Sequence, residues 1–188
     1  MERIQICGGS GAGKTTLARL LSQRLALPFT DLDDLYWEPG WREAPQAVFT
    51  SRVQAAVASP RWVLAGNYHD VTGRQVWPRL TTLIVLDLPL PLMLWRSLRR
   101  TVARGLTGTP CCNGNTESLW RLFHRDGVLR YLLRTWRARR ERYRQFHAMP
   151  ALRHARVVHL TTAAEVAAFA AALPTAAPVP APHGVSLS

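Results

Sequence analysis

Residues near the N-terminus have the types and the spacing of a phosphate-binding loop. The segment Gly8–Thr15 matches G-x-x-x-x-G-K-[ST] at every fixed position, after an apolar strand pattern and before a helical one. Glycines let backbone N–H groups approach phosphate oxygens, and the helix N-terminus adds its positive end. A plain glycine-rich turn is the alternative. It is disfavoured because the only lysine of the 188 residues, Lys14, stands at the motif position.

The motif predicts how a nucleotide would bind. Lys14 is expected to reach the β- and γ-phosphates of ATP as a catalytic residue, and the Thr15 hydroxyl is expected to bind Mg²⁺. The predicted nucleotide-binding residues are Gly8, Gly9, Ser10, Gly11, Ala12, Gly13, Lys14, Thr15 and Thr16.

Two acidic residues follow predicted strands. Asp33 comes after the short strand predicted over 29–32, where a carboxylate can hold Mg²⁺ or accept the proton of an acceptor hydroxyl. Helix capping by Asp33 or its neighbours Asp31 and Asp34 is the alternative. Asp87 ends the apolar run of residues 82–88, a pattern typical of a magnesium-binding Asp, although an Asp before Leu88-Pro89 can also cap a turn. The predicted metal ligands are Thr15, Asp33 and Asp87.

Further polar residues lie on the expected ligand edge of the sheet. Asn67 and Tyr68 follow the third predicted strand, where they would contact an acceptor substrate or simply form a turn. The predicted substrate-binding residues are Asp33, Tyr36, Asn67 and Tyr68.

The basic residues are concentrated in one part of the chain. The net charge is +12, and residues 91–156 hold fifteen Arg against Glu117, Asp126 and Glu141. In P-loop kinases a helical lid brings Arg over the transferred phosphoryl group. Arg100, Arg104 and Arg125 are the catalytic candidates, while a solvated basic face accounts for most of the others. Four aromatic residues and one leucine alternate with these arginines. They are predicted to be core residues rather than a nucleic-acid surface: Trp120, Phe123, Leu132, Trp136 and Tyr143.

Composition excludes several classes of protein. A hydrophobic fraction of 47% excludes a disordered chain, and the longest apolar runs are too short for a membrane span. Cys7 is expected to be a buried apolar residue, and Cys111 and Cys112 lack the spacing of a zinc site. The odd number of cysteines and an N-terminus without a signal-peptide pattern predict a cytoplasmic protein without a membrane partner.

The element order predicts an α/β fold of the three-layer P-loop type. Strands are expected at 3–7, 29–32, 62–65, 82–88 and 156–160, and helices at 14–26, 46–58, 92–104, 117–125, 128–147 and 165–173. Such alternation favours a five-stranded parallel sheet covered on both faces. Residues 105–115 read as a loop. Residues 1–173 would form one domain with an Arg-rich lid at about 95–150, and residues 174–188 a disordered Pro/Ala tail.

Several stretches together resemble one known family. The sequence is similar to the bacterial topology modulation proteins, of the adenylate-kinase-like P-loop group. The matching stretches are the P-loop, Leu32-Asp33-Asp34-Leu35-Tyr36-Trp37-Glu38-Pro39-Gly40-Trp41, Arg61-Trp62-Val63, Gly66-Asn67-Tyr68, Leu86-Asp87-Leu88-Pro89 and Leu94-Trp95-Arg96. The resemblance implies strand order 2-3-1-4-5, ATP-Mg²⁺ binding, and site roles for Asp33 and Asn67. The family's third strand often ends Asp-Gly-Asn-Tyr; Ala65 replaces that Asp here, which shifts a metal or base role to Asp33.

The sequence thus favours a kinase that transfers phosphate from ATP to a nucleotide or another small acceptor. An ATP-gated regulator that binds nucleic acid through the Arg block and affects DNA topology is the alternative. A nucleotide binder without turnover is a third hypothesis, based on Ala65.

Overall fold

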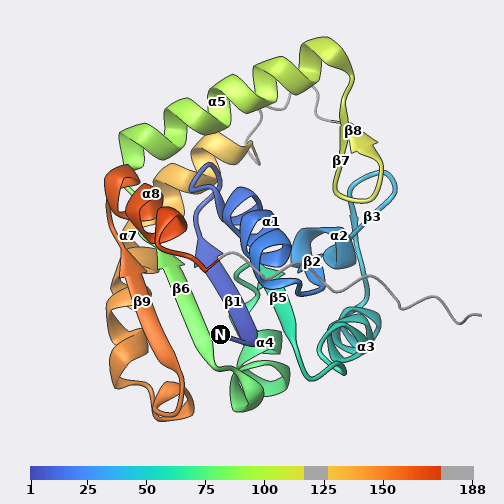
Figure 1. The fold of residues 1–188 in the computed structure, drawn as a ribbon. Helices are drawn as coiled ribbons and strands as arrows, with labels where there is room; N and C mark the ends of the chain where they lie inside the picture. The colour runs from blue at the N-terminus through green and yellow to red at the C-terminus, as the bar shows by residue number, and fades with distance from the viewer. Residues whose placement is uncertain (117–126, 175–188) are drawn as a thin grey trace, which may run out of the picture.

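Five parallel strands form the central sheet of the computed structural model, which describes residues 1–116 and 127–174. They are β1 (Arg3–Gly8), β2 (Phe29–Asp31), β5 (Trp62–Ala65), β6 (Thr82–Leu86) and β9 (Arg156–Leu160). Their spatial order is β2-β5-β1-β6-β9 (Figure 1). Counted in chain order, these strands have the order 2-3-1-4-5. The predicted sheet is therefore confirmed.

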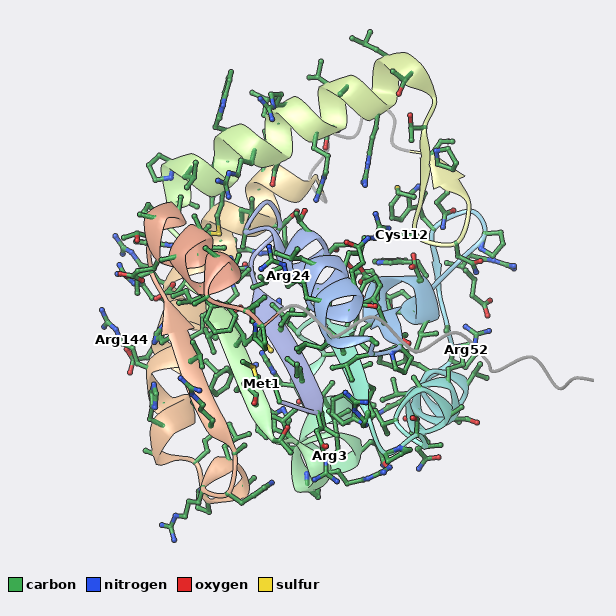
Figure 2. All side chains as sticks on the ribbon, viewed as in Figure 1. Met1, Arg3, Arg24, Arg52, Cys112 and Arg144 are labelled. Carbon is green, nitrogen blue, oxygen red and sulfur yellow. The ribbon has the colours of Figure 1, made fainter. Side chains whose placement is uncertain are left out.

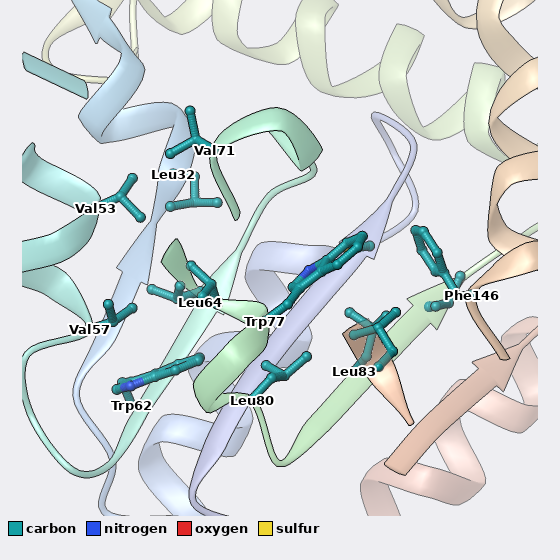
Figure 3. Close-up of a cluster of buried hydrophobic side chains, with 14 of the residues drawn as sticks. Leu32, Val53, Val57, Trp62, Leu64, Val71, Trp77, Leu80, Leu83 and Phe146 are labelled. Carbon is teal, nitrogen blue, oxygen red and sulfur yellow. The ribbon is translucent and has the colours of Figure 1, made fainter. Parts of the chain in front are cut away.

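Side chains alternate between the two faces of the sheet, and each face carries its own core. Ile4 and Ile6 pack with Leu21 of α1 (Lys14–Leu25), in the cluster that α8 (Ala163–Ala171) also covers. Cys7, as expected, is fully buried, and packs in the opposite cluster with residues of α3 (Gln46–Ala56) and α4 (His69–Gln75). Figure 3 shows this second cluster, in which Leu32 lies beside Val53 and Val71, and Trp77 lies between Leu64 and Phe146. The result is the predicted three-layer arrangement.

The Arg-rich region forms two long helices. Helix α5 (Leu90–Thr107) crosses above the end of the sheet where β1 leads into α1, and α7 (Val128–Gln145) runs back beside β9 (Figure 1). The core face predicted for α7 is confirmed, because Leu132 is 0% and Tyr143 1% exposed. The predicted helix 117–125, with Trp120 and Phe123, lies outside the described residues, as do residues 175–188 of the predicted tail.

The structure adds two hairpins that were not predicted, one of them inside a predicted loop. Residues 37–43 form the hairpin β3 (Trp37–Glu38) and β4 (Arg42–Glu43), and the predicted loop 105–115 contains the hairpin β7 (Pro110–Cys111) and β8 (Asn115–Thr116). Two-residue strands carry no periodic signal, and these are stabilised by contacts between the hairpins. Asn115 accepts from the Trp41 backbone N–H (2.9 Å) and donates to the Glu38 carbonyl (3.0 Å).

Other short elements complete the chain. They are α2 (Leu32–Tyr36) and the 3-10 helices Trp77–Arg79 (η1), Phe146–Ala148 (η2) and Pro150–Leu152 (η3). Neither α2 nor α4 was predicted. None of the helices within residues 1–116 and 127–174 is long and apolar enough to cross a membrane.

One core histidine predicts how stability responds to pH. The ring of His69 lies 5.3 Å from that of Phe146, and its Nδ1 is buried without a hydrogen-bond partner among residues 1–116 and 127–174. Burial, and then the Arg142 charge, lower the pKa of His69 from 6.5 to about 4, against the opposing effect of Asp70. The unfolded chain therefore takes up this proton near pH 6.5, whereas the folded chain resists until about pH 4. The contribution is present above pH 6.5 and is lost as the pH falls.

We expect the free energy of unfolding to fall by about 2 kcal/mol between pH 7 and pH 4 through this group, after allowance for partial exposure of the ring. Urea unfolding at a series of pH values measures it. His69→Phe, which keeps an aromatic ring in the cluster, should remove that part of the pH dependence. An identical pH dependence in the variant would contradict the assignment.

Candidate active site

The loop between β1 and α1 has the backbone geometry of a phosphate cradle. Gly11 (φ 75°) and Gly13 (φ 97°) have positive φ angles, and Gly13 is the N-cap of α1. A Cβ on Gly11 would lie 2.4 Å from the Met93 carbonyl oxygen of α5. The glycine at this position is thus required both by its φ angle and by the close approach of α5. The loop opens into a cavity that residues 9–16 line.

Lys14 lines this cavity. Its Nζ donates to the Gly9 carbonyl oxygen (3.3 Å), so the side chain folds back along the loop. Burial lowers the pKa of Lys14, and the Asp33 and Asp31 carboxylates oppose that shift. An ammonium group whose charged form is poorly solvated gains most when an anion enters the cavity.

Asp31, rather than Asp33, contacts the P-loop hydroxyl. Thr15 Oγ1 donates to Asp31 Oδ2 (2.7 Å), and Asp31 Oδ1 accepts from the Asp33 backbone N–H (3.1 Å). Burial, and the neighbouring Asp33 charge, raise the pKa of Asp31. The sequence analysis considered Asp31 as a helix cap, which it is, but missed its contact with Thr15. The alternation of Asp31 and Asp33 at the end of the strand was the sequence feature from which the Thr15 contact could have been predicted.

The donor set at this position fits a magnesium ion. A hydroxyl and two mutually repelling carboxylates are hard oxygen ligands, and a cation would relieve the repulsion that raises the pKa of Asp31. Among the residues that the structure describes, no group of three or more His, Cys, Asp or Glu side chains could hold a metal. Phosphate oxygens and water would therefore complete the shell, as Mg²⁺ prefers.

Asp33 has a different neighbour. Tyr68 Oη donates to Asp33 Oδ1 (2.6 Å), and both side chains line the cavity. Burial and the Asp33 charge raise the pKa of Tyr68, so its phenol stays protonated and can donate. Tyr68 also has a positive φ of 21°, a strained value for a residue other than glycine, at the N-cap of α4.

Aromatic side chains form one end of the cavity. Tyr36 packs against Tyr68 (4.8 Å between ring centroids) and against Trp37 (5.1 Å), and Trp37 packs against Trp41 (5.6 Å). Cys112, in the turn between β7 and β8, also lines this end (Figure 2). The structure thus brings the predicted substrate residues Asp33, Tyr36 and Tyr68 together.

Two predicted site residues have their polar atoms occupied by other contacts. Asn67 lines the cavity, but its side-chain oxygen and nitrogen both bond to the backbone of Gly8. Asp87 is 7% exposed, is absent from the described cavity lining, and pairs with Arg140 Nε (3.2 Å) and His159 Nε2 (3.4 Å). These contacts favour a structural role for Asp87, and its metal role stays a prediction.

Arginines cover the cavity opposite α1. Arg100 donates to Ser10 Oγ (2.9 Å), and Arg104 lines the cavity on the same helix. Arg125 lies outside the described residues. The sequence analysis missed Arg139 of α7. A Cβ on Gly9 would lie 3.3 Å from the Arg139 guanidinium. Its two terminal nitrogens are buried and have no hydrogen-bond partner in the part of the chain that the structure describes.

Comparisons with known proteins agree with this geometry. The family model for shikimate kinase matches residues 10–56. Shikimate kinase of Chlamydia muridarum is 26% identical over 125 residues, which cover 58% of this chain and 68% of that protein. Shikimate kinase of Pseudomonas savastanoi is 36% identical over 70 residues, 29% of this chain and 41% of that one. Fold and sequence together indicate an ATP-dependent phosphotransferase.

A solved structure extends the likeness over most of the chain. Shikimate kinase from Acinetobacter baumannii, in complex with shikimate, superposes with a TM-score of 0.50 at 19% identity. The match covers 91% of this chain and 89% of that one, and at this identity it shows the P-loop kinase fold. These similar proteins are kinases, which supports the predicted P-loop kinase group but not the topology modulation family within it.

Proposed function

We propose that this protein transfers the γ-phosphate of ATP to a small-molecule acceptor that carries a hydroxyl or phosphate group. The observation that carries the proposal is the contact of Thr15 with Asp31 (2.7 Å) beside Lys14, at the mouth of the glycine loop. This group of side chains offers a cation, a hydroxyl and carboxylates to a bound triphosphate. Lys14 would contact the β- and γ-phosphates as a point charge, and the loop N–H groups would hold their oxygens.

Magnesium and the arginines have separate parts in this proposal. Thr15 and Asp31 would hold Mg²⁺, which offsets phosphate charge and orients the nucleotide when it is bound, and Asp33 would serve the acceptor. Arg139 and Arg100 lie at Gly9 and Ser10 of the loop and would contact the transferred group. The Arg-rich region at about 95–150 would act as a lid over the nucleotide.

We place the acceptor at the aromatic end of the cavity. Asp33 accepts from Tyr68, which packs against Tyr36 of the aromatic wall, and its charge acts on Lys14 of the phosphate loop. A carboxylate there would accept the hydrogen bond of an acceptor hydroxyl and then its proton, as the oxygen bonds to phosphorus and ADP leaves. Flat aromatic rings favour a planar or partly apolar acceptor, which a nucleoside or nucleotide would satisfy. A compound such as shikimate is the other candidate, by similarity to the relatives above.

Replacing Asp33 by asparagine is expected to lower kcat about 100-fold and to leave the Kd for ATP within about threefold. The variant keeps shape and hydrogen bonding but removes the proton acceptor. Steady-state kinetics with calorimetric ATP binding measure both quantities. Asp34→Asn is the matched control, since it removes the same charge from an exposed neighbouring side chain. Equal losses of kcat and ATP affinity would show that Asp33 serves binding alone.

The function itself is tested by γ-phosphate transfer from labelled ATP-Mg²⁺ to a panel of acceptors. The panel contains nucleoside monophosphates, nucleosides, shikimate, gluconate and short oligonucleotides. A phosphorylated product that forms only with intact Lys14 supports the proposal and names the acceptor. ATP binding without transfer to any of them would favour the nucleotide binder without turnover, for which Ala65 is the sequence argument.

One surface favours the second candidate, a nucleic-acid-binding regulator like the topology modulation proteins. Along α7, Arg130, Arg137 and Arg144 are exposed, with Leu133 57% exposed between them. A stripe of exposed arginines suits a polyanion. Binding through six or more phosphate contacts would weaken about 1,000-fold between 50 and 200 mM salt, whereas small-substrate turnover would change far less.

A further inference from the structure

A polar network joins Gly8, the first residue of the phosphate loop, to Asn67 after β5 and to Tyr143 of α7. Asn67 Oδ1 accepts from the Gly8 backbone N–H (3.0 Å), and Asn67 Nδ2 donates to the Gly8 carbonyl oxygen (3.0 Å). One side chain thus satisfies both backbone groups of the residue that starts the loop. This is the pattern that a neighbouring strand would make.

The end of β5 explains why a side chain takes this place. Strands β1 and β5 pair in register up to Ile6 and Ala65, and the Gly66 backbone N–H still donates to the Ile6 carbonyl (3.0 Å). The chain then turns away at Gly66, which has φ 143° and no room for a Cβ, since one would lie 2.7 Å from Leu32 Cβ. Asn67 therefore continues the pairing with its amide. On the other side Gly8 pairs with Leu86 of β6, so Gly8 is held from both sides.

A tyrosine from α7 fixes the orientation of that amide. Tyr143 is 1% exposed, and its Oη donates to Asn67 Oδ1 (3.2 Å). Burial raises the pKa of Tyr143 well above its ordinary value, so the phenol is a permanent donor. With Oδ1 accepting from both Tyr143 and Gly8, the Nδ2 group must face the Gly8 carbonyl. Arg139, at Gly9, is one helical turn before Tyr143 on α7.

We propose that Asn67 is a positioning residue that sets the entry of the phosphate loop, and that Tyr143 acts through it and ties α7 to the loop. The inference rests on the proposed function, because the quantity it controls is ATP binding by the loop. Loss of the two Asn67 hydrogen bonds, here called the Asn67 clamp, would leave Gly8 held only by its pairing with Leu86. The following N–H groups would then lose their common orientation toward the phosphates. The carboxamide is thus a support of the site and not a substrate contact.

The test compares three variants of the full chain by calorimetric ATP-Mg²⁺ binding, acceptor KM, thermal unfolding and amide NMR of Gly8–Gly13. Asn67→Leu removes the clamp at similar size, and Tyr143→Phe removes one hydroxyl. Thr72→Val is the matched control. Thr72 is also buried at this corner and donates to the Asn67 backbone carbonyl (3.3 Å), not to its amide.

We expect the Kd for ATP to rise about 10-fold in Asn67→Leu and about threefold in Tyr143→Phe, with the acceptor KM within about twofold. The loop amide shifts should move in both variants and stay unchanged in Thr72→Val. Adding Tyr143→Phe to Asn67→Leu should change the Kd no further, since Tyr143 has then lost the group it acts on. Tyr143→Phe keeps the test available if Asn67→Leu does not fold.

Three results would overturn the inference: ATP affinity and loop shifts that stay as in the wild type while only the melting temperature falls, equal changes in Thr72→Val, or additive effects in the double variant. Each would reduce Asn67 and Tyr143 to ordinary packing and hydrogen bonding. Wild-type protein that binds ATP but transfers no phosphate would instead overturn the proposed function. The affinity comparison would still decide the role of Asn67.

Discussion

Replacing Lys14 by alanine is expected to lower ATP-dependent phosphoryl transfer about 1,000-fold while the fold stays intact. Lys14 is the only lysine of the chain, and its ammonium lies on the loop against the Gly9 carbonyl (3.3 Å). No second lysine can substitute for it. Single-turnover transfer of labelled phosphate measures the effect, and circular dichroism checks the fold.

The stability of this variant separates a site residue from a structural one. Burial lowers the pKa of Lys14, so the folded protein holds this charge at a cost in free energy. We therefore expect the melting temperature of Lys14→Ala to stay the same or to rise. Lys14→Arg should be inactive as well, because the planar guanidinium group of arginine does not replace the compact ammonium group of lysine. Normal turnover in Lys14→Ala would refute the phosphate cradle.

Replacing Arg139 by methionine is expected to lower kcat/KM about 100-fold and to raise the melting temperature. The terminal guanidinium nitrogens are buried without a hydrogen-bond partner among the described residues, and the group lies 5.9 Å from the ring of Tyr131. A buried and unpaired charge destabilises the folded state. Arg139 lies next to Gly9, and a phosphate bound on the loop would supply the missing hydrogen-bond acceptors.

Arg137→Met is the matched control for this prediction. It removes the same charge two residues away on α7, from a side chain that is exposed. Kinetics and thermal unfolding of both variants, with and without ATP, give the comparison. ATP should stabilise the wild type more than Arg139→Met, and Arg137→Met should behave as the wild type. If Arg139→Met were less stable and fully active, Arg139 would be a packing residue instead.

The role of Lys14 could be predicted from the sequence, whereas the role of Arg139 could not. Lys14 belongs to a local motif, in which every residue needed for the chemistry lies within one loop and one helix turn. Arg139 was one of many arginines in the basic block. Its role depends on which face of α7 packs toward Gly9, and that follows from the burial of Leu132 and Tyr143.

The same distinction applies to the acidic residues. The sequence placed Asp33 at the site from its position after a strand, and the structure brings it to Tyr68. The Thr15 contact of Asp31 was missed, because a residue that caps a helix and contacts a distant loop shows only the first role in its local pattern. The pairing of Asp87 with Arg140 joins residues 53 positions apart and has no local signal.

The sequence by itself determined the order of the five main strands along the chain, the parallel sheet and the phosphate loop, because each depends on hydrophobic period or on backbone geometry within a short segment. The spatial order of the strands was implied only by the resemblance to the topology modulation proteins. The tertiary structure alone decided which side chains meet across that frame: the Asn67 clamp on Gly8, Arg139 at Gly9, and the Trp41–Asn115 contact between two short hairpins. These contacts join segments far apart in the chain. Their geometry is set by how helices pack on the sheet, and a local sequence pattern does not record it.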